Sequence, residues 1–348
     1  MRRALLVLSC IMLAVGNCAG PLIMRLYFIR GGKRIWLSSW LVTAGWPVMP
    51  AILLISYLRR RSRSHGPEKA KPILMKPAVF LASAAIGVLQ GLDDYLYAYG
   101  EARLPASTAG LVISTELAFT AGFAFVLVKQ KFTAHSVNAV YVLTMAAAVL
   151  AVRSNGDRWK GESTADYVFG FAMMVAAAAL YGAILPLIEL MNKKVVKTGE
   201  ISYTVVLEIQ AVICFSATAF CTVGMLINKD FQAIPREARE FELGEGKYYL
   251  VVACSAVVWQ LFFVGAIGVI FCASSLFSGI VTTLLLPVTE ILAVVFFKET
   301  FHAEKGIALA LSLWGFFFYF YGEMAAANGT KSTAPQTVDD QMLIPEEA

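Results

Sequence analysis

Apolar residues along this chain gather into runs of about 17–25 residues, separated by short polar or charged segments. A helix of that length crosses the hydrocarbon core of a bilayer, which is roughly 30 Å thick. The runs therefore predict ten transmembrane helices, and we expect nearly everything between them to be loop. The predicted spans are 4–28, 37–58, 77–99, 105–128, 135–152, 167–190, 201–227, 248–271, 274–297 and 305–322.

The composition supports a bilayer as the solvent of this protein. Hydrophobic residues make up 58% of the 348 positions and charged residues 15%, whereas a soluble globular protein is about half apolar and about a quarter charged. This excess excludes a soluble enzyme, a disordered protein and a DNA-binding domain. The first run begins like a signal peptide, but its hydrophobicity continues through Tyr27 and Phe28, so we expect a retained first helix.

The charge pattern bears on the orientation of the helices. Seven basic residues gather in the segment 59–76, and a basic loop between two apolar helices is typical of the cytoplasmic side. An even number of spans places both termini on one side of the membrane. We therefore expect cytoplasmic termini and no nucleic acid partner.

An internal repeat organises the ten spans into two halves. Residues 110–134 align without a gap on residues 279–303, with nine of 25 positions identical, including Thr120 with Thr289 and Lys129 with Lys298. Five helices per copy is an odd number, so the second copy has to insert upside down, as in many secondary transporters. The pattern predicts a first repeat over 1–155, a second repeat over 156–324 and a disordered polar tail over 325–348.

Charged side chains inside the predicted spans are the first candidates for function. Each costs about 2.5–3.5 kcal/mol at the bilayer centre, and the deepest acids are Asp93, Asp94, Glu116 and Glu290. Gln90, Asp93 and Asp94 share one face of their helix, because they lie at i, i+3 and i+4. That face lines a transport pathway in one interpretation and forms a structural polar seam in the other.

The repeat distinguishes two of these acids from architectural residues. Glu116, which we place at the middle of the span 105–128, aligns with Leu285, and Glu290 aligns with Ala121. An acid needed only for architecture is expected in both copies. The asymmetry favours a role in binding a substrate or a proton.

Aromatic and amide side chains complete the candidate site. The relevant residues are Asn17, Trp46, Trp259 and Gln260. An indole face can stack on a flat heterocycle while amides and carboxyls bond to its edge. Most membrane tryptophans instead anchor at the interface, but Trp259 lies too deep in its span for that role.

Motifs for catalysis or metal binding are missing from the sequence. There is no HExxH, GxSxG or P-loop pattern, and the six cysteines lie in or beside apolar runs without a CxxC pair. We therefore expect no catalytic residues, no cofactor and no metal.

Several long motifs resemble the plant purine permease family, which belongs to the drug/metabolite transporter superfamily. They are NCAGPLIMRLYFIRGGKRIWLSSWLVTAGWP (17–47), QGLDDYLYAYG (90–100), LPASTAGLVISTELAFTAGFAFVLVKQKFT (104–133), GVIFCASSLFSGI (268–280) and LLPVTEILAVVFFKETF (285–301). The resemblance covers residues 1–322. It implies a ten-helix, proton-coupled importer of adenine, cytokinins and related nitrogen heterocycles, usually at the plasma membrane, with some members on internal membranes. Glutamine is common in the family where Glu116 stands, which suits a substrate contact.

Our hypothesis is a proton symporter that works by alternating access, as a monomer or a homodimer. Trp46 or Trp259 would stack on the purine, and the polar substrate contacts would come from Asn17, Gln90, Asp94, Glu116 and Gln260. Asp93 or Asp94 would carry the coupled proton, and Glu290 would share it or brace the opposite repeat.

Two other functions remain open from the sequence. One is an organellar exchanger of nucleotide sugars or sugar phosphates, which would need Lys or Arg projecting into the cavity from mid-helix, whereas the basic residues here lie at helix ends and in loops. The other is a membrane receptor that binds a ligand without transporting it.

Overall fold

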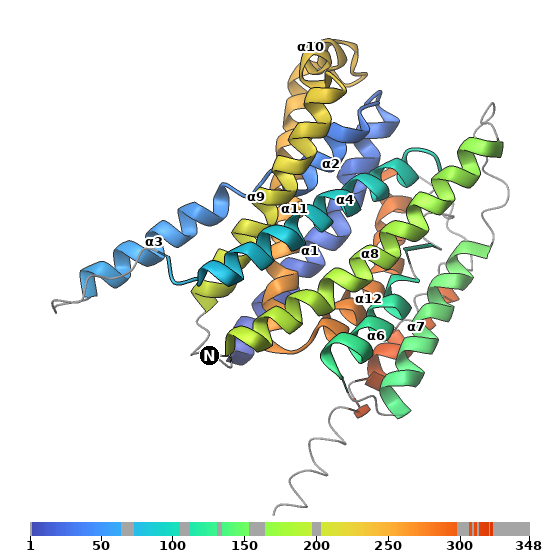
Figure 1. Ribbon diagram of the computed structural model, residues 1–348. Coiled ribbons are helices and arrows are strands. Elements are labelled where there is room, and N and C mark those ends of the chain that lie inside the picture. Colours follow the sequence, from blue (N-terminus) through green and yellow to red (C-terminus); the bar gives the residue numbers. More distant parts are fainter. Residues whose placement is uncertain are drawn as a thin grey trace, which may run out of the picture.

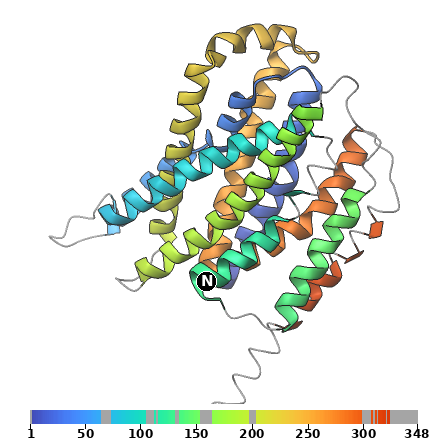
Figure 2. The ribbon, with the colours of Figure 1, turned by 45° about the vertical axis from the view of Figure 1, so that its right-hand side comes forward.

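In the computed structural model, the described residues form helices joined by turns, without a strand among them (Figures 1 and 2). The described residues are 2–63, 73–104, 112–113, 115–130, 134–152, 164–196, 203–297, 306–307, 310–311, 313–319 and 321–322. The helices are α1 (Arg2–Ile29), α2 (Ile35–Thr43), α3 (Val48–Arg63), α4 (Pro77–Glu101), α6 (Glu116–Val128), α7 (Ala134–Val152), α8 (Thr164–Val196), α9 (Tyr203–Ile227), α10 (Asp230–Glu240), α11 (Glu245–Cys272) and α12 (Ser275–Phe297).

Seven segments of this described part are long and apolar enough to cross a membrane. Six of them are the helices α1, α4, α8, α9, α11 and α12, and the seventh is the segment 35–58, which contains α2 and most of α3. Helix α6 is apolar but shorter. Of the remaining predicted spans, 305–322 is described in pieces, each of them helical, and the tail 325–348 lies outside the described residues. The fold is therefore that of an all-helical membrane protein.

Two predicted spans have different boundaries in the structure. The span 37–58 is broken at 44–47, where Gly45 approaches α11 so closely that a Cβ would lie 2.3 Å from the backbone oxygen of Ala256. Pro47 in the same turn has no N–H to donate. In the span 105–128, helix α6 begins only at Glu116, and residues 105–111 lie outside the described part.

Close helix contacts through glycine hold α1 against α11. A Cβ on Gly16 would lie 2.4 Å from the backbone nitrogen of Phe262, and one on Gly265 would lie 2.3 Å from the backbone nitrogen of Leu13. Small residues allow this approach because lipid gives no hydrophobic drive for helix association, so tight packing has to supply the attraction. The same helix α1 also packs on α12, while α8 packs on both α4 and α6.

We expected a loop between α9 and α11. This expectation is wrong, because the segment contains the helix α10. Ile234, Ala238 and Phe241 recur at i, i+4 and i+7 and pack into the core, while the opposite face is charged. α10 lies at the end of the bundle opposite the N-terminus (Figures 1 and 2). It connects α9 to α11 and covers the ends of both helices.

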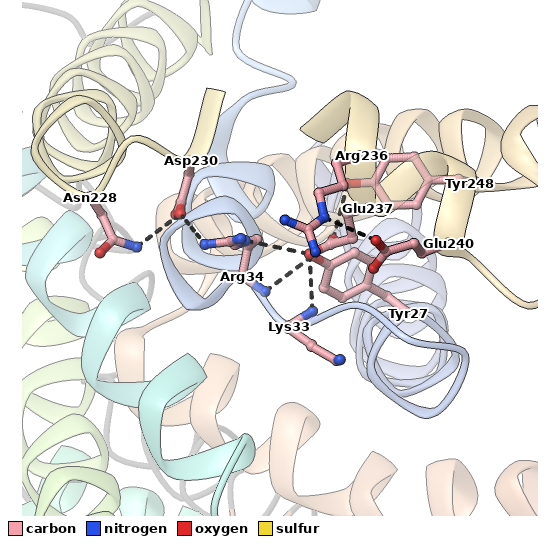
Figure 3. A network of polar contacts seen from close by, with 9 residues as sticks. All are labelled: Tyr27, Lys33, Arg34, Asn228, Asp230, Arg236, Glu237, Glu240 and Tyr248. Carbon is pink, nitrogen blue, oxygen red and sulfur yellow. Dashed lines mark hydrogen bonds and ion pairs between the residues drawn. The ribbon is translucent and has the colours of Figure 1, made fainter. Parts of the chain in front are cut away.

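Glu237 of α10 is the centre of a buried polar network at this end (Figure 3). Its Oε1 accepts hydrogen bonds from the hydroxyls of Tyr27 and, at 3.1 Å, Tyr248. Its Oε2 accepts from the backbone nitrogen of Lys33 at 3.3 Å and lies 3.6 Å from Nε of Arg34. One carboxylate thus ties α10 to α1, to the segment before α2, and to α11.

Asp230 extends this network from the first residue of α10 (Figure 3). Its Oδ1 accepts from Nδ2 of Asn228 at 2.8 Å and from Nη1 of Arg34 at 3.4 Å. Burial raises the pKa of Asp230 above its ordinary value of 3.8, against the lowering effects of Asn228 and Arg34.

Two further acids bind helix N-termini at the opposite end. Both carboxylate oxygens of Glu208 accept from backbone nitrogens just before α4, with the shortest bond, from Met75, at 2.8 Å. Glu189 accepts from the backbone nitrogen of Ser275 at 2.7 Å and pairs with Lys193 at 2.7 Å. An anionic carboxylate is favourable there because the first N–H groups of a helix lack intrahelical acceptors.

Candidate functional site

A cavity of about 170 Å³ lies between α1, α2, α4, α6, α8, α11 and α12. The residues that line it are Asn17, Pro21, Leu22, Arg25, Val42, Gln90, Asp93, Asp94, Tyr97, Glu101, Ile113, Glu116, Ala177, Ala178, Tyr181, Trp259, Phe262, Phe263, Thr282, Leu286, Thr289 and Ala293. Thirteen of these 22 side chains are apolar or aromatic, and the other nine are polar or charged. This is the usual character of a small-molecule site.

Most of the residues singled out from the sequence meet at this cavity. They are Asn17, Gln90, Asp93, Asp94, Glu116 and Trp259. Trp46 and Gln260 are not part of the lining: the ring of Trp46 lies edge-on to Phe215, at 5.1 Å between centroids, and Gln260 is buried in α11. The side chain of Glu290 lies outside the described residues.

Gln90 joins the two neighbouring acids of α4. Its Nε2 donates to Oδ1 of Asp94 at 2.9 Å and to Oδ2 of Asp93 at 3.3 Å. The other oxygens, Oδ1 of Asp93 and Oδ2 of Asp94, are buried and have no hydrogen-bond partner. Since an unpaired buried polar atom is costly, these two oxygens are suited to bind a proton or a ligand.

Several aromatic side chains also line the cavity. Trp259 packs against α1, where a Cβ on Gly20 would lie 3.0 Å from its Cε2, and its Nε1 is buried without a hydrogen-bond partner. Phe262 lies edge-on to Trp259 at 5.6 Å, and Tyr181 follows at 6.2 Å from Phe262. An indole N–H without a partner, beside an aromatic wall, can donate to a flat heterocycle.

Asn17 and Glu116 line the cavity and also lie at contacts between helices. Nδ2 of Asn17 donates to the backbone oxygen of Thr282 at 3.2 Å, which links α1 to α12. Glu116 was placed at mid-helix from the sequence, and this position is wrong, because Glu116 is the first residue of α6. The apolar run around it conceals the helix boundary.

Arg25 and Glu101 are lining residues that the sequence analysis missed. We expected the basic residues to lie at helix ends and outside the cavity. Arg25 lies near the end of α1, but it lines the cavity, so the second part of this expectation is wrong. The overlooked signal is helical spacing: Arg25 follows Asn17 by eight positions and Glu101 follows Asp94 by seven, so each lies on the same face as the earlier residue.

Comparison with known proteins adds sequence relatives to this geometry. Residues 4–328 match a family model described as purine nucleobase transmembrane transport. The chain is 52% identical to purine permease 3 of Arabidopsis thaliana over 93% of this chain and 92% of that protein. It is also 52% identical to purine permease 2 of the same plant, over 97% and 96% of the two chains, and 36% identical to probable purine permease 5, over 91% and 85%.

One solved structure, titled only "Crystal structure of protein", shares the fold. It aligns with a TM-score of 0.63 over 92% of this chain and 99% of its own, at 15% sequence identity. At that identity the likeness concerns the fold alone.

Proposed function

Because this chain belongs to the plant purine permease family, we propose that it carries purine nucleobases and their derivatives, cytokinins among them, across a membrane by proton-coupled alternating access. The observation that carries the proposal is the cavity itself, which is lined both by Asp93 and Asp94, each with an unpaired carboxyl oxygen, and by the aromatic side chain of Trp259. The aromatic side chain can bind the face of a flat heterocycle, and the carboxyl groups can bind its polar edge or a proton in the same cavity.

The purine would lie against Trp259, with its edge toward α4. Trp259 would stack on the ring or donate from Nε1, and Asn17, Gln90, Asp94 and Glu116 would bond to the ring nitrogens and the exocyclic group. Trp46 and Gln260 would contact the purine only in another conformation of the transport cycle, since neither lines the present cavity.

Asp93 or Asp94 would carry the coupled proton. Gln90 supplies one hydrogen bond to each carboxyl, so each acid keeps one unpaired oxygen at which a proton can bind. Protonation would also remove the repulsion between the two neighbouring carboxylates. Glu290 would share the proton or brace the second repeat.

Alternating access would involve two inverted repeats, 1–155 and 156–324, of five helices each. The helix packing is consistent with this division: α1 packs on α11 and α12, and α8 packs on α4 and α6. Exchanging α1 with α8, α11 with α4 and α12 with α6 turns the first set of contacts into the second. We place both termini on the cytoplasmic side, on the basis of the basic segment 59–76, and propose the plasma membrane as the location in keeping with the resemblance to the family.

An exchanger of phosphorylated substrates is a second candidate, because Arg25 lines the cavity. Four acidic side chains line the same cavity, namely Asp93, Asp94, Glu101 and Glu116. One guanidinium among four acids gives a poor environment for a phosphate dianion, which the acids would repel. The balance of charge favours a neutral or weakly basic heterocycle.

The test is uptake of labelled adenine by yeast that lacks its own purine carrier, with and without a protonophore. Proton coupling predicts that the protonophore abolishes accumulation, and undiminished accumulation would reject it. Binding of adenine without uptake would point to a receptor. Inhibition by a sugar phosphate but not by purines would point to the exchanger.

A further inference from the structure

The polar lining of the cavity is arranged in two levels along the helix axes. Three helices each contribute a polar residue and another one seven or eight positions later; α4 adds Gln90 and Asp93 beside the first of its pair and Tyr97 beside the second. This separation is two helical turns, or about 10–12 Å. The pairs are Asn17 and Arg25 in α1, Asp94 and Glu101 in α4, and Thr282 and Thr289 in α12.

The second residues of the three pairs lie at the same end because the three helices run in the same direction. Along α1, Leu13 meets Gly265 and Gly16 meets Phe262, so α1 and α11 are antiparallel. The tight turn at 273–274 makes α12 antiparallel to α11 as well, and therefore parallel to α1.

The direction of α4 follows from its contacts with α9. Gly87 meets Ile213 and Gly91 meets Ala217, so these two helices are parallel. Helix α9 returns through α10 into α11 and runs against it (Figure 1). The outer level, defined as Arg25, Glu101 and Thr289, thus lies together on the side of the cavity nearer α10.

The outer level presents hydrogen-bond donors and acceptors next to each other. Glu101 is hydrogen-bonded to Tyr97 through its side chain, while its Oε2 is buried and has no hydrogen-bond partner. The guanidinium of Arg25, with Cζ 5.4 Å from the ring centroid of Phe297, lines the same cavity. Thr289 donates to the backbone oxygen of Leu285 at 3.0 Å, so its hydroxyl oxygen can still accept.

This chemistry matches a neutral group that donates and accepts at once, because the charges of Arg25 and Glu101 offset each other. A hydroxyl meets that requirement: its hydrogen can bond to Glu101 and its oxygen to Arg25. A bicyclic ring held at Asn17 and Asp94 is too short to reach the outer level two turns away. Only a substituent on the ring can span that distance.

We infer that Arg25, Glu101 and Thr289 form a second subsite, which selects purines whose substituent ends in a hydroxyl while the ring occupies the inner level. This inference rests on the proposed purine site. It assigns substrate selection to residues that an unsubstituted purine does not touch.

A matched pair of ligands tests the subsite. One is adenine with a straight butyl chain on its exocyclic amine that ends in a hydroxyl, and the other carries the pentyl chain of the same length. Affinities of the purified full chain for adenine and for both derivatives would be measured by calorimetry. We expect the wild type to prefer the hydroxylated chain by about tenfold, the scale of one charged hydrogen bond.

Glu101→Leu should abolish that preference while changing the affinity for adenine less than about twofold. Thr289→Val, nearly equal in volume, should reduce the preference partially and serves as the second variant should Glu101→Leu fail to fold. The control is Glu242→Leu, an exposed acid paired with Arg30 at 3.1 Å near the same end of the bundle, which should keep the preference.

The outcomes separate the subsite from the purine site. If the wild type binds adenine but binds the hydroxylated and the pentyl derivative with equal affinity, the subsite is overturned and the proposed function stays intact. The same holds if both subsite variants keep the wild-type preference for the hydroxylated derivative. Failure of the wild type to bind any of the three ligands overturns the proposed function and the subsite with it.

Discussion

The amide nitrogen of Gln90 lies 2.9 Å from Oδ1 of Asp94, one helical turn further along α4, and it also reaches Asp93. One neutral side chain therefore orients two neighbouring carboxyls in the cavity wall. Removing it leaves the two acids without their shared donor. The acids would then reorient or repel each other, and the substrate would meet a different surface.

Gln90→Leu is expected to raise the KM for adenine uptake by about tenfold, since a hydrogen bond to a charged group contributes about 1.5–3 kcal/mol. The matched control is Gln210→Leu, because Gln210 is equally buried but donates to Sγ of Cys214 and does not line the cavity. Equal effects of the two substitutions on KM would argue against a role of Gln90 in the site.

Trp259→Leu should weaken purine binding by about 1–3 kcal/mol, the scale of stacking between a base and an aromatic ring. Trp259→Phe should recover part of that loss, because it keeps a ring face. Equilibrium binding of adenine to purified protein measures both. Trp36 stacks on Tyr95 at 4.0 Å and lies outside the lining, so Trp36→Leu should leave affinity near wild type, and a loss equal to that of Trp259→Leu would contradict the stacking role.

Gly265→Ala is expected to lower the melting temperature of the detergent-solubilised protein, because the new Cβ would lie 2.3 Å from a backbone nitrogen of α1, which cannot move aside alone. Gly122→Ala in α6 is the matched control, since nothing lies within 4 Å of its Cβ position. Alanine favours a helix interior over glycine by roughly 0.5–1 kcal/mol, so Gly122→Ala should be neutral or stabilising. If Gly122→Ala lowered the melting temperature and Gly265→Ala did not, our interpretation of the close contact between α1 and α11 would be wrong.

Tyr248→Phe should destabilise the protein by about 1–3 kcal/mol, because it removes a donor to the buried carboxylate of Glu237. The adjacent Tyr249→Phe is the control, since Tyr249 is 44% exposed. Thermal unfolding in detergent compares the two variants. Equal melting temperatures would show that the network around Glu237 contributes little to stability.

Asp230 gives this end of the bundle a pH-dependent stability. Because burial raises the pKa of Asp230, its carboxyl group stays protonated in the folded protein over a pH interval in which it is already ionised in the unfolded chain. The stabilisation is fully present below the unfolded pKa and is lost as pH rises through the folded pKa. Melting temperatures of the wild type should therefore fall relative to Asp230→Asn as pH rises from acid to neutral, and parallel curves would refute this assignment.

The sequence predicted the long spans well because hydrophobic length alone determines them. It failed at α10, which is amphipathic and only 11 residues long, so a search for long apolar runs passes over it. The signal was present in Ile234, Ala238 and Phe241 at helical spacing. The break before α3 was hidden because Gly45 and Pro47 are residue types that are also frequent within membrane helices.

The candidate site was predictable in part. Buried acids and amides are costly in a bilayer, and that cost identified Gln90, Asp93, Asp94 and Asn17 before their positions were known. Arg25 and Glu101 were passed over because residues near a helix end were assumed to face the interface. Which polar residues share a cavity depends on the register between helices, and the close glycine contacts that fix this register are not visible in one sequence.

The contact between Gly16 and Phe262 also bears on how the chain is made. The two residues touch through backbone atoms, although most of the described helices lie between them in the sequence. At ribosomal rates of about 5–20 residues per second, α1 waits on the order of tens of seconds for α11 to be synthesised. The first helix therefore completes its packing late, and a premature stop before α11 would damage the beginning of the protein as well as its end.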